Sequence, residues 1–339
     1  DLWNDFKKGT SKEEMKERIY GAVEECLSHG TQYIRAQTDC TDPNLTGIKA
    51  ALEVRDELKD KVTIQVVAFP QNGMYSYEEE GKTGRDLVEE ALKLGCEVVG
   101  GIPHNEWSRE LGEKSIKEIV NLAVKYDKLI DVHCDETDDV MSRFVEVLNA
   151  EAMINKIGEK TTASHTCSFG SADDSYAFRM MGLFRKSKLN FIALPTENAF
   201  LQGRQDSYPK RRGLTRVLEF VDNGINVCFA QDSIVDLWYP AGNGNLMNIL
   251  DNGIHLSQLM REKDFEKDFD LVTYNGAKTM HIEDEYGFDP GKPANFIVLD
   301  AENEFEAIRN RAECLASVRE GKFLFKKAKR EYDVKLNIR

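Results

Sequence analysis

The sequence has no long apolar run and no signal-peptide pattern at its start. A helix that crosses a membrane needs about 20 consecutive apolar residues, and the apolar runs of this chain are much shorter. We therefore expect a cytoplasmic protein with no membrane partner.

The chain has fewer basic than acidic residues. The chain has 45 Lys and Arg against 59 Asp and Glu, which gives a formal net charge of -14. Such a balance opposes binding to nucleic acid through a general basic surface. We expect a small-molecule substrate, no nucleic-acid partner and a homo-oligomer.

Cysteine pairs with metal-binding or redox spacing are also missing. The seven cysteines are odd in number and contain no CxxC motif. This pattern indicates free thiols in a reducing compartment, where cysteine behaves as a small buried apolar residue.

The 339 residues are enough for a large core, as one barrel-sized domain or two domains. Short apolar segments alternate with charge-rich segments of helical periodicity, and this alternation predicts βα units and a parallel sheet. The expected strands are Gln32–Ala36, Thr63–Phe69, Glu97–Ile102, Leu129–His133, Thr161–His165, Asn190–Leu194 and Asn226–Gln231. The expected helices are Lys12–Leu27, Leu45–Leu58, Gly84–Leu94, Glu113–Tyr126, Asp139–Ile157, Ser175–Ser187, Gly213–Asn223 and Phe265–Met280.

Seven βα units are one short of an eight-stranded barrel, and a helix precedes the first strand. Either the sheet is open, or a first strand lies outside this sequence. Turn residues then frame short strands at Asn295–Leu299, Ser317–Arg319 and Phe323–Phe325, which predict a small β appendage.

Three of the expected strands end in a potential metal ligand: His133, His165 and Asp232. Catalytic groups of parallel α/β folds lie at such strand ends. Imidazole nitrogen and carboxylate oxygen suit Zn²⁺ or Fe²⁺, so we expect His133 and Asp232 to bind one divalent metal. His165 is either a ligand or the group that orients the attacking water.

Glu136 lies three residues after His133, and we expect it to be the general acid/base. The alternative is a charge at the start of the following helix. We assign that second role to Asp138 and Asp139.

Other strand ends offer candidates for substrate binding. The Gln71 amide can donate and accept, as the N–C=O edge of a heterocycle requires, although it could equally bond its own turn. Trp238 is either a packed aromatic residue or a lid over a flat ring. His104, Glu106 and Trp107 are further candidates for the pocket wall.

Longer blocks carry a family resemblance. V-A-F-P-Q, G-I-P-H, L-I-D-V-H-C-D-E-T-D-D, A-S-H-T, L-Q-G-R-Q-D-S-Y-P-K-R-R-G and G-I-N-V-C-F-A-Q-D-S-I-V-D-L-W-Y-P resemble the bacterial cytosine deaminases of the amidohydrolase superfamily, from about Gly30 to about Leu315. The resemblance implies a metal-dependent (β/α)8 TIM-like barrel with a small β-sandwich domain. The barrel would occupy residues 1–284, with seven of its eight βα units in this chain, and the remainder of the sandwich residues 285–339.

The resemblance also implies roles for single residues. His133 and Asp232 match the metal ligands, His165 the contact to the bound water, Glu136 the proton shuttle to the ring nitrogen, and Gln71 the group that reads the amide edge.

The sequence departs from the family pattern twice. The family's first barrel strand ends in HxH and supplies two more metal ligands, and this sequence contains no HxH. The family usually has an aspartate directly after the metal-binding one, where this chain has Ser233. Serine is smaller and uncharged, so we expect Ser233 to contact the substrate and to admit a bulkier ring.

The activity that these residues predict is hydrolytic deamination of cytosine or a 5-substituted cytosine, with release of ammonia. A deaminase or amidohydrolase that acts on isoguanine, creatinine or a triazine is the alternative. A truncated, inactive barrel that only binds a ligand is the alternative of another class, because the HxH motif is absent.

Overall fold

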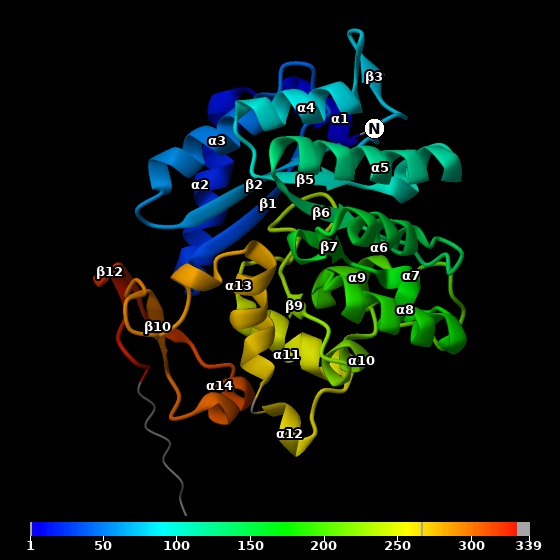
Figure 1. Ribbon diagram of the computed structural model, residues 1–339. Coiled ribbons are helices and arrows are strands. Elements are labelled where there is room, and N and C mark those ends of the chain that lie inside the picture. The colour runs from blue at the N-terminus through cyan, green and yellow to red at the C-terminus, as the bar shows by residue number, and fades with distance from the viewer. Residues whose placement is uncertain (1, 266, 331–339) are drawn as a thin grey trace, which may run out of the picture.

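The computed structural model describes residues 2–265 and 267–330. Its main sheet has seven parallel strands in the order β1-β2-β5-β6-β7-β8-β9. The sheet curls into a half-barrel with helices on its outer face (Figure 1). Its strands are β1 (Tyr33–Asp39), β2 (Thr63–Phe69), β5 (Val98–Gly101), β6 (Leu129–His133), β7 (Thr161–Ser164), β8 (Asn190–Ala193) and β9 (Val227–Phe229).

Short helices and helical turns are more numerous than the sequence pattern predicts. The α-helices are α1 (Leu2–Gly9), α2 (Lys12–Ser28), α3 (Thr46–Leu58), α4 (Gly84–Leu94), α5 (Arg109–Tyr126), α6 (Phe144–Asn155), α7 (Cys167–Gly170), α8 (Asp174–Ser187), α9 (Pro195–Leu201), α10 (Val217–Asp222), α11 (Leu246–Ser257), α12 (Glu262–Phe265), α13 (Tyr274–Met280) and α14 (Glu304–Asn310). The 3-10 turns are η1 (Pro103–Asn105), η2 (Gly158–Lys160), η3 (Asp268–Val272) and η4 (Glu283–Glu285).

Local sequence explains where several helices begin. Ser11 and Glu14 form a reciprocal capping box at the start of α2, and Thr83 and Asp86 form another at the start of α4. Each box satisfies backbone N–H groups that have no partner inside the helix.

The seven predicted barrel strands are all present, with ends that differ by up to three residues. The helix expected from Asp139 instead begins at Phe144. Asp135 lies at its start, because its Oδ2 accepts hydrogen bonds from the backbone N–H groups of Phe144 and Val145. The assignment of Asp138 and Asp139 to that role was therefore wrong. Asp138 instead accepts a hydrogen bond from the Gly203 backbone.

Fully buried aromatic rings fix part of the helical layer on the sheet. Phe191 of β8 stacks on Phe220 of α10 at 4.4 Å between ring centroids, and Phe184 of α8 meets Phe191 edge-on at 4.8 Å. Each such pair adds about 0.5–1.5 kcal/mol beyond the apolar area that it buries.

A second sheet confirms the predicted β appendage. It consists of the antiparallel strands β10 (Phe296–Leu299), β11 (Cys314–Arg319) and β12 (Lys322–Lys326). The buried Gln32 amide, just before β1, donates to Ser317 Oγ and to the Val318 carbonyl at 2.9 Å each, which joins this sheet to the barrel. Positions 331–339 of the proposed 285–339 segment lie outside the described residues. A two-stranded hairpin, β3 (Glu78–Glu79) and β4 (Lys82–Thr83), precedes α4.

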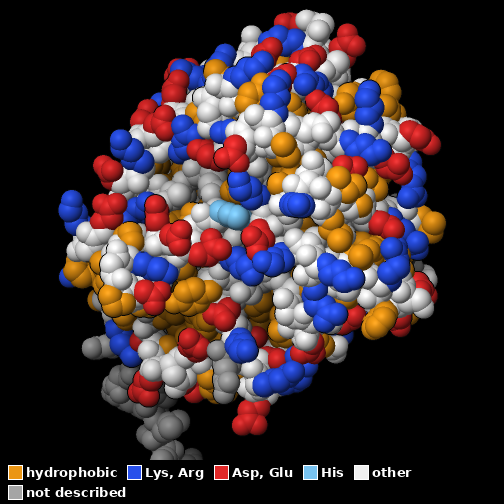
Figure 2. All heavy atoms as spheres, viewed as in Figure 1, with side chains coloured by type: hydrophobic (Ala, Val, Ile, Leu, Met, Phe, Trp, Pro, Cys, Tyr) orange, Lys and Arg blue, Asp and Glu red, His pale blue; other side chains and the backbone are white. Residues whose placement is uncertain are grey.

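The surface agrees with the mixed composition. Acidic and basic side chains alternate over the face in Figure 2, with apolar side chains scattered between them. In the part of the chain that the structure describes, no helix combines the length and apolar character that a membrane crossing requires. All seven cysteines are free and buried, as the sequence predicts.

Candidate metal-dependent active site

The site lies where β6 and β7 end, above a buried ion pair. Arg35 Nη1 on β1 lies 3.0 Å from Asp131 Oδ2 on β6, and both side chains are almost completely buried. Asp131 also accepts a hydrogen bond from Ser164 on β7. Because side chains alternate along a strand, His133 is on the same face of β6 as Asp131 and lies above this pair.

Two imidazole rings meet at the strand ends. The His133 and His165 ring centroids are 4.4 Å apart, and the Phe69 ring at the end of β2 packs 4.4 Å from His133. His165 follows β7 with a positive φ of 63°. Asp232, after β9, also has a positive φ, of 67°. Non-glycine residues adopt this left-handed backbone rarely, and often at functional sites.

Glu136 bridges the two rings from the loop after β6. Its Oε1 lies 3.4 Å from His165 Nδ1, and its Oε2 lies 4.0 Å from His133 Nδ1. Asn198 Nδ2 is 3.4 Å from Glu136 Oε1 and 3.1 Å from His165 Nδ1. The alternative role of Glu136 at the start of the next helix does not agree with these contacts.

Asp232 adjoins the same group. Its Oδ2 lies 3.8 Å from His165 Nε2, and that nitrogen is buried without a hydrogen-bond partner among the described residues. The structure thus brings together all four residues that the sequence predicts for the metal and the chemistry.

The surroundings disfavour the charged forms of both imidazoles and both carboxyl groups. Desolvation lowers the pKa of His133 to about 3, and that of His165 also falls, through burial and then its histidine neighbours. Burial, with Asp236 and Asp131 nearby, raises the pKa of Asp232 to about 7. Burial and then the charges of Asp232 and Glu197 raise the pKa of Glu136. Neutral nitrogen donors beside crowded carboxylates are a donor set that a divalent cation would stabilise.

The residues present fit a metal ion. Ligand atoms of His133, Glu136 and His165 all lie within 4.8 Å of one another. His165 Nε2, buried without a partner, faces the Asp232 carboxylate across the same space. Both a His–Glu–His set and a set that includes Asp232 can be built from these donors.

Two of the predicted substrate-binding residues lie beside the first strand ends. His104 is close enough to His133 for the two rings to affect each other, and burial followed by His133 lowers the pKa of His104 to about 3. Gln71 follows Phe69, whose ring contacts His133, and the Gln71 backbone N–H bonds the Phe69 carbonyl.

The other two follow β9. Ser233 donates a hydrogen bond of 3.4 Å to Glu197 Oε1. Trp238 packs against Trp3 of α1, with 5.1 Å between the ring centroids.

The two other candidates for the pocket wall near His104 are Glu106 and Trp107. Glu106 accepts backbone hydrogen bonds from Met74, Tyr75 and Ser76, so it holds the loop after β2. Trp107 is 81% exposed and does not line the site.

Sequence reasoning missed the contribution of α9. Glu197 and Asn198 are both almost completely buried on this helix, and Asn198 contacts two of the predicted catalytic groups. The available signal was L-P-T-E-N directly after the strand at 190–194, because proline at a first helical position marks a helix start at a strand end.

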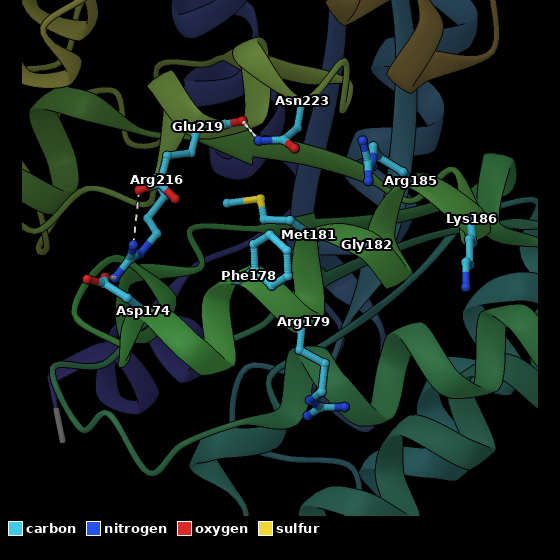
Figure 3. Close-up of a pocket in the computed structure, with 10 residues that line it drawn as sticks. All are labelled: Asp174, Phe178, Arg179, Met181, Gly182, Arg185, Lys186, Arg216, Glu219 and Asn223. Atoms are coloured by element: carbon cyan, nitrogen blue, oxygen red, sulfur yellow. Dashed lines mark hydrogen bonds and ion pairs between the residues drawn. The ribbon is translucent and has the colours of Figure 1, made fainter.

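A surface groove of about 660 Å³ lies elsewhere on the protein, between α8 and α10. Figure 3 shows Phe178 and Met181 in it, with the Arg216–Asp174 ion pair at one side. Its lining residues include none of the strand-end groups, so the groove is separate from the candidate active site.

Comparison with known proteins agrees with the strand-end site. The profile of the amidohydrolase family matches residues 3–325. The chain belongs to the amidohydrolase family. Members of this family are generally metal-dependent, and this chain is an enzyme that acts on C–N bonds.

One solved structure and two curated proteins of this family are similar to the chain. The crystal structure of 5-methylcytosine deaminase from Klebsiella pneumoniae, liganded with 5-fluorocytosine, is 43% identical with a TM-score of 0.94, covering 98% of this chain and 79% of that one. N-isopropylammelide isopropyl amidohydrolase of Pseudomonas sp. (strain ADP) is 27% identical over 95% of this chain and 75% of that protein. Pterin deaminase of Rhizobium rhizogenes is 25% identical over 93% of this chain and 70% of that protein. The chain is thus an amidohydrolase-type deaminase by its relatives.

Proposed function

We propose that this amidohydrolase deaminates a pyrimidine-like ring, with cytosine or a 5-substituted cytosine as substrate. Water replaces the exocyclic amine, so a C–O bond forms, the C–N bond breaks and ammonia leaves. The observation that carries the proposal is Glu136, a half-buried carboxyl group whose oxygens lie within 4.0 Å of both imidazoles. The 43% identity to a 5-methylcytosine deaminase supports the choice of ring.

We assign His133 and Asp232 as the protein ligands of one divalent ion, Zn²⁺ or Fe²⁺. When bound, the ion supplies Lewis acidity that allows water to attack near neutral pH. A His–Glu–His set would instead make Glu136 a ligand, and the loss of metal from a Glu136 variant would distinguish it.

His165 orients the attacking water in this proposal. Asn198 donates to His165 Nδ1, so a neutral ring carries its proton on Nε2. That N–H faces Asp232 at 3.8 Å, where it can donate to water or to the developing oxyanion.

Glu136 moves the proton. Its raised pKa favours the protonated form, which is the form that a general acid toward a ring nitrogen requires. Asn198 holds the carboxyl group by one oxygen, so the group keeps its orientation while it transfers the proton.

Gln71, His104, Ser233 and Trp238 bind the ring in this proposal. The Gln71 amide pairs with the N–C=O edge, and Trp238, packed on Trp3, forms an aromatic wall. His104 contributes a neutral ring beside His133.

A second candidate substrate is an amino-substituted triazine or another cyclic amidine, such as isoguanine or creatinine. The relative from Pseudomonas, an N-isopropylammelide amidohydrolase, favours keeping it, as does the small side chain of Ser233.

The test measures ammonia release from cytosine, 5-methylcytosine, isoguanine, creatinine and an aminotriazine, with metal content determined on the same sample. We expect near-stoichiometric Zn²⁺ or Fe²⁺, turnover of a cytosine, and loss of activity on chelation that the metal restores. Metal-loaded protein that turns over none of these rings would contradict the proposal.

A further inference from the structure

Glu197 is a buried carboxyl group that the proposed chemistry does not yet use. It lies on the first turn of α9 and is 1% exposed. Ser233 Oγ donates to its Oε1 at 3.4 Å, while its Oε2 is buried without a partner among the described residues. An acceptor left unpaired in the interior costs free energy, and such exceptions call for an explanation.

The neighbourhood of Glu197 is unfavourable for a negative charge. Burial and then the charges of Asp232 and Asp236 raise the pKa of Glu197 to about 8. The next residue, Asn198, reaches into the site and contacts Glu136 and His165. The carboxyl group of Glu197 therefore lies next in the chain to a residue that contacts two of the proposed catalytic groups.

The hydrogen bond to Glu197 determines what Ser233 can offer a substrate. A serine hydroxyl has one proton and two lone pairs. Because its proton is used toward Glu197 Oε1, Ser233 Oγ retains only acceptor capacity on its free side. An acceptor at that position matches the N–H groups of an exocyclic amine and does not match the carbonyl oxygen that replaces the amine in the product.

We propose that Glu197 is a specificity-determining positioning residue, which fixes the Ser233 hydroxyl as an acceptor for the exocyclic amine of the substrate. The cytosine deaminase pattern usually has an aspartate at this position, where this chain has Ser233 with Glu197 beside it. The serine leaves room beside the ring, and the glutamate behind it sets the polarity. This inference rests on the proposed deaminase function.

The experiment uses Glu197→Met, which removes the acceptor but keeps the volume, and Glu197→Gln, whose amide oxygen can still accept from Ser233. In Glu197→Met the freed hydroxyl can donate to a carbonyl. We expect KM for the amino substrate to rise by about 5- to 20-fold and the inhibition constant of the oxo product to fall by at least about 3-fold. Glu197→Gln should stay within about 3-fold of wild type for both.

The opposite signs of these two changes separate positioning from simple structural damage, which would weaken substrate and product alike. Ser233→Ala should raise KM without tightening the product, and Glu197→Met should have no further effect in the Ser233→Ala background. Metal content and the thermal unfolding midpoint of each variant show that the site is intact.

Asp236→Asn is the matched control, because Asp236 is an acidic neighbour that bonds the Trp238 and Tyr239 backbone instead of Ser233. Its ratio of substrate KM to product inhibition constant should stay within about 2-fold of wild type. Equal weakening of substrate and product in Glu197→Met, or a matching ratio change in Asp236→Asn, would overturn the inference. Wild-type protein that deaminates no ring would instead reject the proposed function.

Discussion

At the residue scale, the candidate site contains two pairs of like side chains in different surroundings. His133 and His165 are both strand-end histidines, but only His165 receives a hydrogen bond from Asn198 that determines its tautomer. Glu136 and Asp232 are both acids with raised pKa values, but Glu136 lies between the rings and Asp232 on the far side of His165. We expect these surroundings, more than residue type, to separate the proposed roles within each pair.

Glu136→Gln tests the proton transfer. The amide keeps the size and the contact to Asn198 but cannot donate an acidic proton, so kcat should fall by about 10²–10⁴. Bound metal, measured by elemental analysis, should remain at the wild-type level. Substantial loss of metal in this variant would identify Glu136 as a ligand.

Asp232→Asn tests whether Asp232 is a metal ligand. Removal of a residue that only hydrogen-bonds a metal ligand costs about 10- to 100-fold in metal affinity. Removal of a ligand itself should therefore cost at least about 100-fold. Competition with a chromogenic chelator measures the affinity directly. Wild-type affinity in this variant would exclude Asp232 from the ligands.

At the element scale, α1 connects the two ends of the open sheet. Its Trp3 Nε1 and Lys7 Nζ each lie 2.7 Å from Asp39 at the end of β1, and Trp3 also packs on Trp238 after β9. Asn4 contacts Asn72, next to Gln71. The helix thus reaches three of the loops that surround the candidate site.

Lys7→Met and Lys8→Met on α1 form a matched pair. The Lys7–Asp39 ion pair is buried, with side chains 9% and 7% exposed. Lys7→Met leaves the Asp39 carboxylate buried without its cation, and should cost about 3–5 kcal/mol of unfolding free energy. Lys8 pairs with Glu79 on the surface, so its loss should cost under about 1 kcal/mol.

Chemical unfolding measures both variants. Because Trp3 supports Trp238, Lys7→Met should also raise KM more than it lowers kcat. Equal stabilities for the two variants would show that α1 is not anchored through Asp39.

The loop after β2 depends on one carboxylate. Glu106 accepts backbone hydrogen bonds from Met74, Tyr75 and Ser76. Glu106→Gln replaces one acceptor by a donor that faces N–H groups, which should cost about 1–3 kcal/mol and loosen the segment that carries Gln71. We expect a lower thermal midpoint and a higher KM. Glu110→Gln, on the exposed first turn of α5, is the control and should leave both unchanged.

At the scale of the whole molecule, pH acts on stability through buried acids as well as on catalysis. Asp268 of η3 is 2% exposed, and burial followed by repulsion from Asp264, with Arg261 opposing, raises its pKa to about 7. The folded protein therefore binds this proton more tightly than the unfolded chain does. The contribution of Asp268 to the unfolding free energy is fully present below about pH 4 and is lost as the pH rises through about 7.

Asp268→Asn removes that dependence. The unfolding free energies of variant and wild type are measured at pH 5 and at pH 8. The variant should become more stable relative to wild type by about 1–3 kcal/mol as the pH rises from 5 to 8. Asp60→Asn, at an exposed position, should show no such trend. Parallel pH profiles for wild type and Asp268→Asn would contradict the expectation.

The sequence by itself determined the repeated βα pattern and the strand-end groups. Apolar runs that stop at His133, at His165 and near Asp232 specify both a buried strand and the residue at its tip, because burial and strand length are local properties. The long motif blocks add the family, and the β appendage followed from turn residues around short strands. These parts were predictable because each depends on neighbours in the chain.

Only the tertiary structure decided how the side chains meet. Glu197 and Asn198 lie on a helix too short for periodicity to reveal, and their partners Ser233, Glu136 and His165 are 30 or more positions away. Asp135, and not the predicted Asp138 or Asp139, lies at the start of α6 for the same reason. The path of the preceding loop determines which carboxylate faces the free N–H groups of the helix. Contacts between distant segments depend on packing, and the one-dimensional pattern carries no record of them.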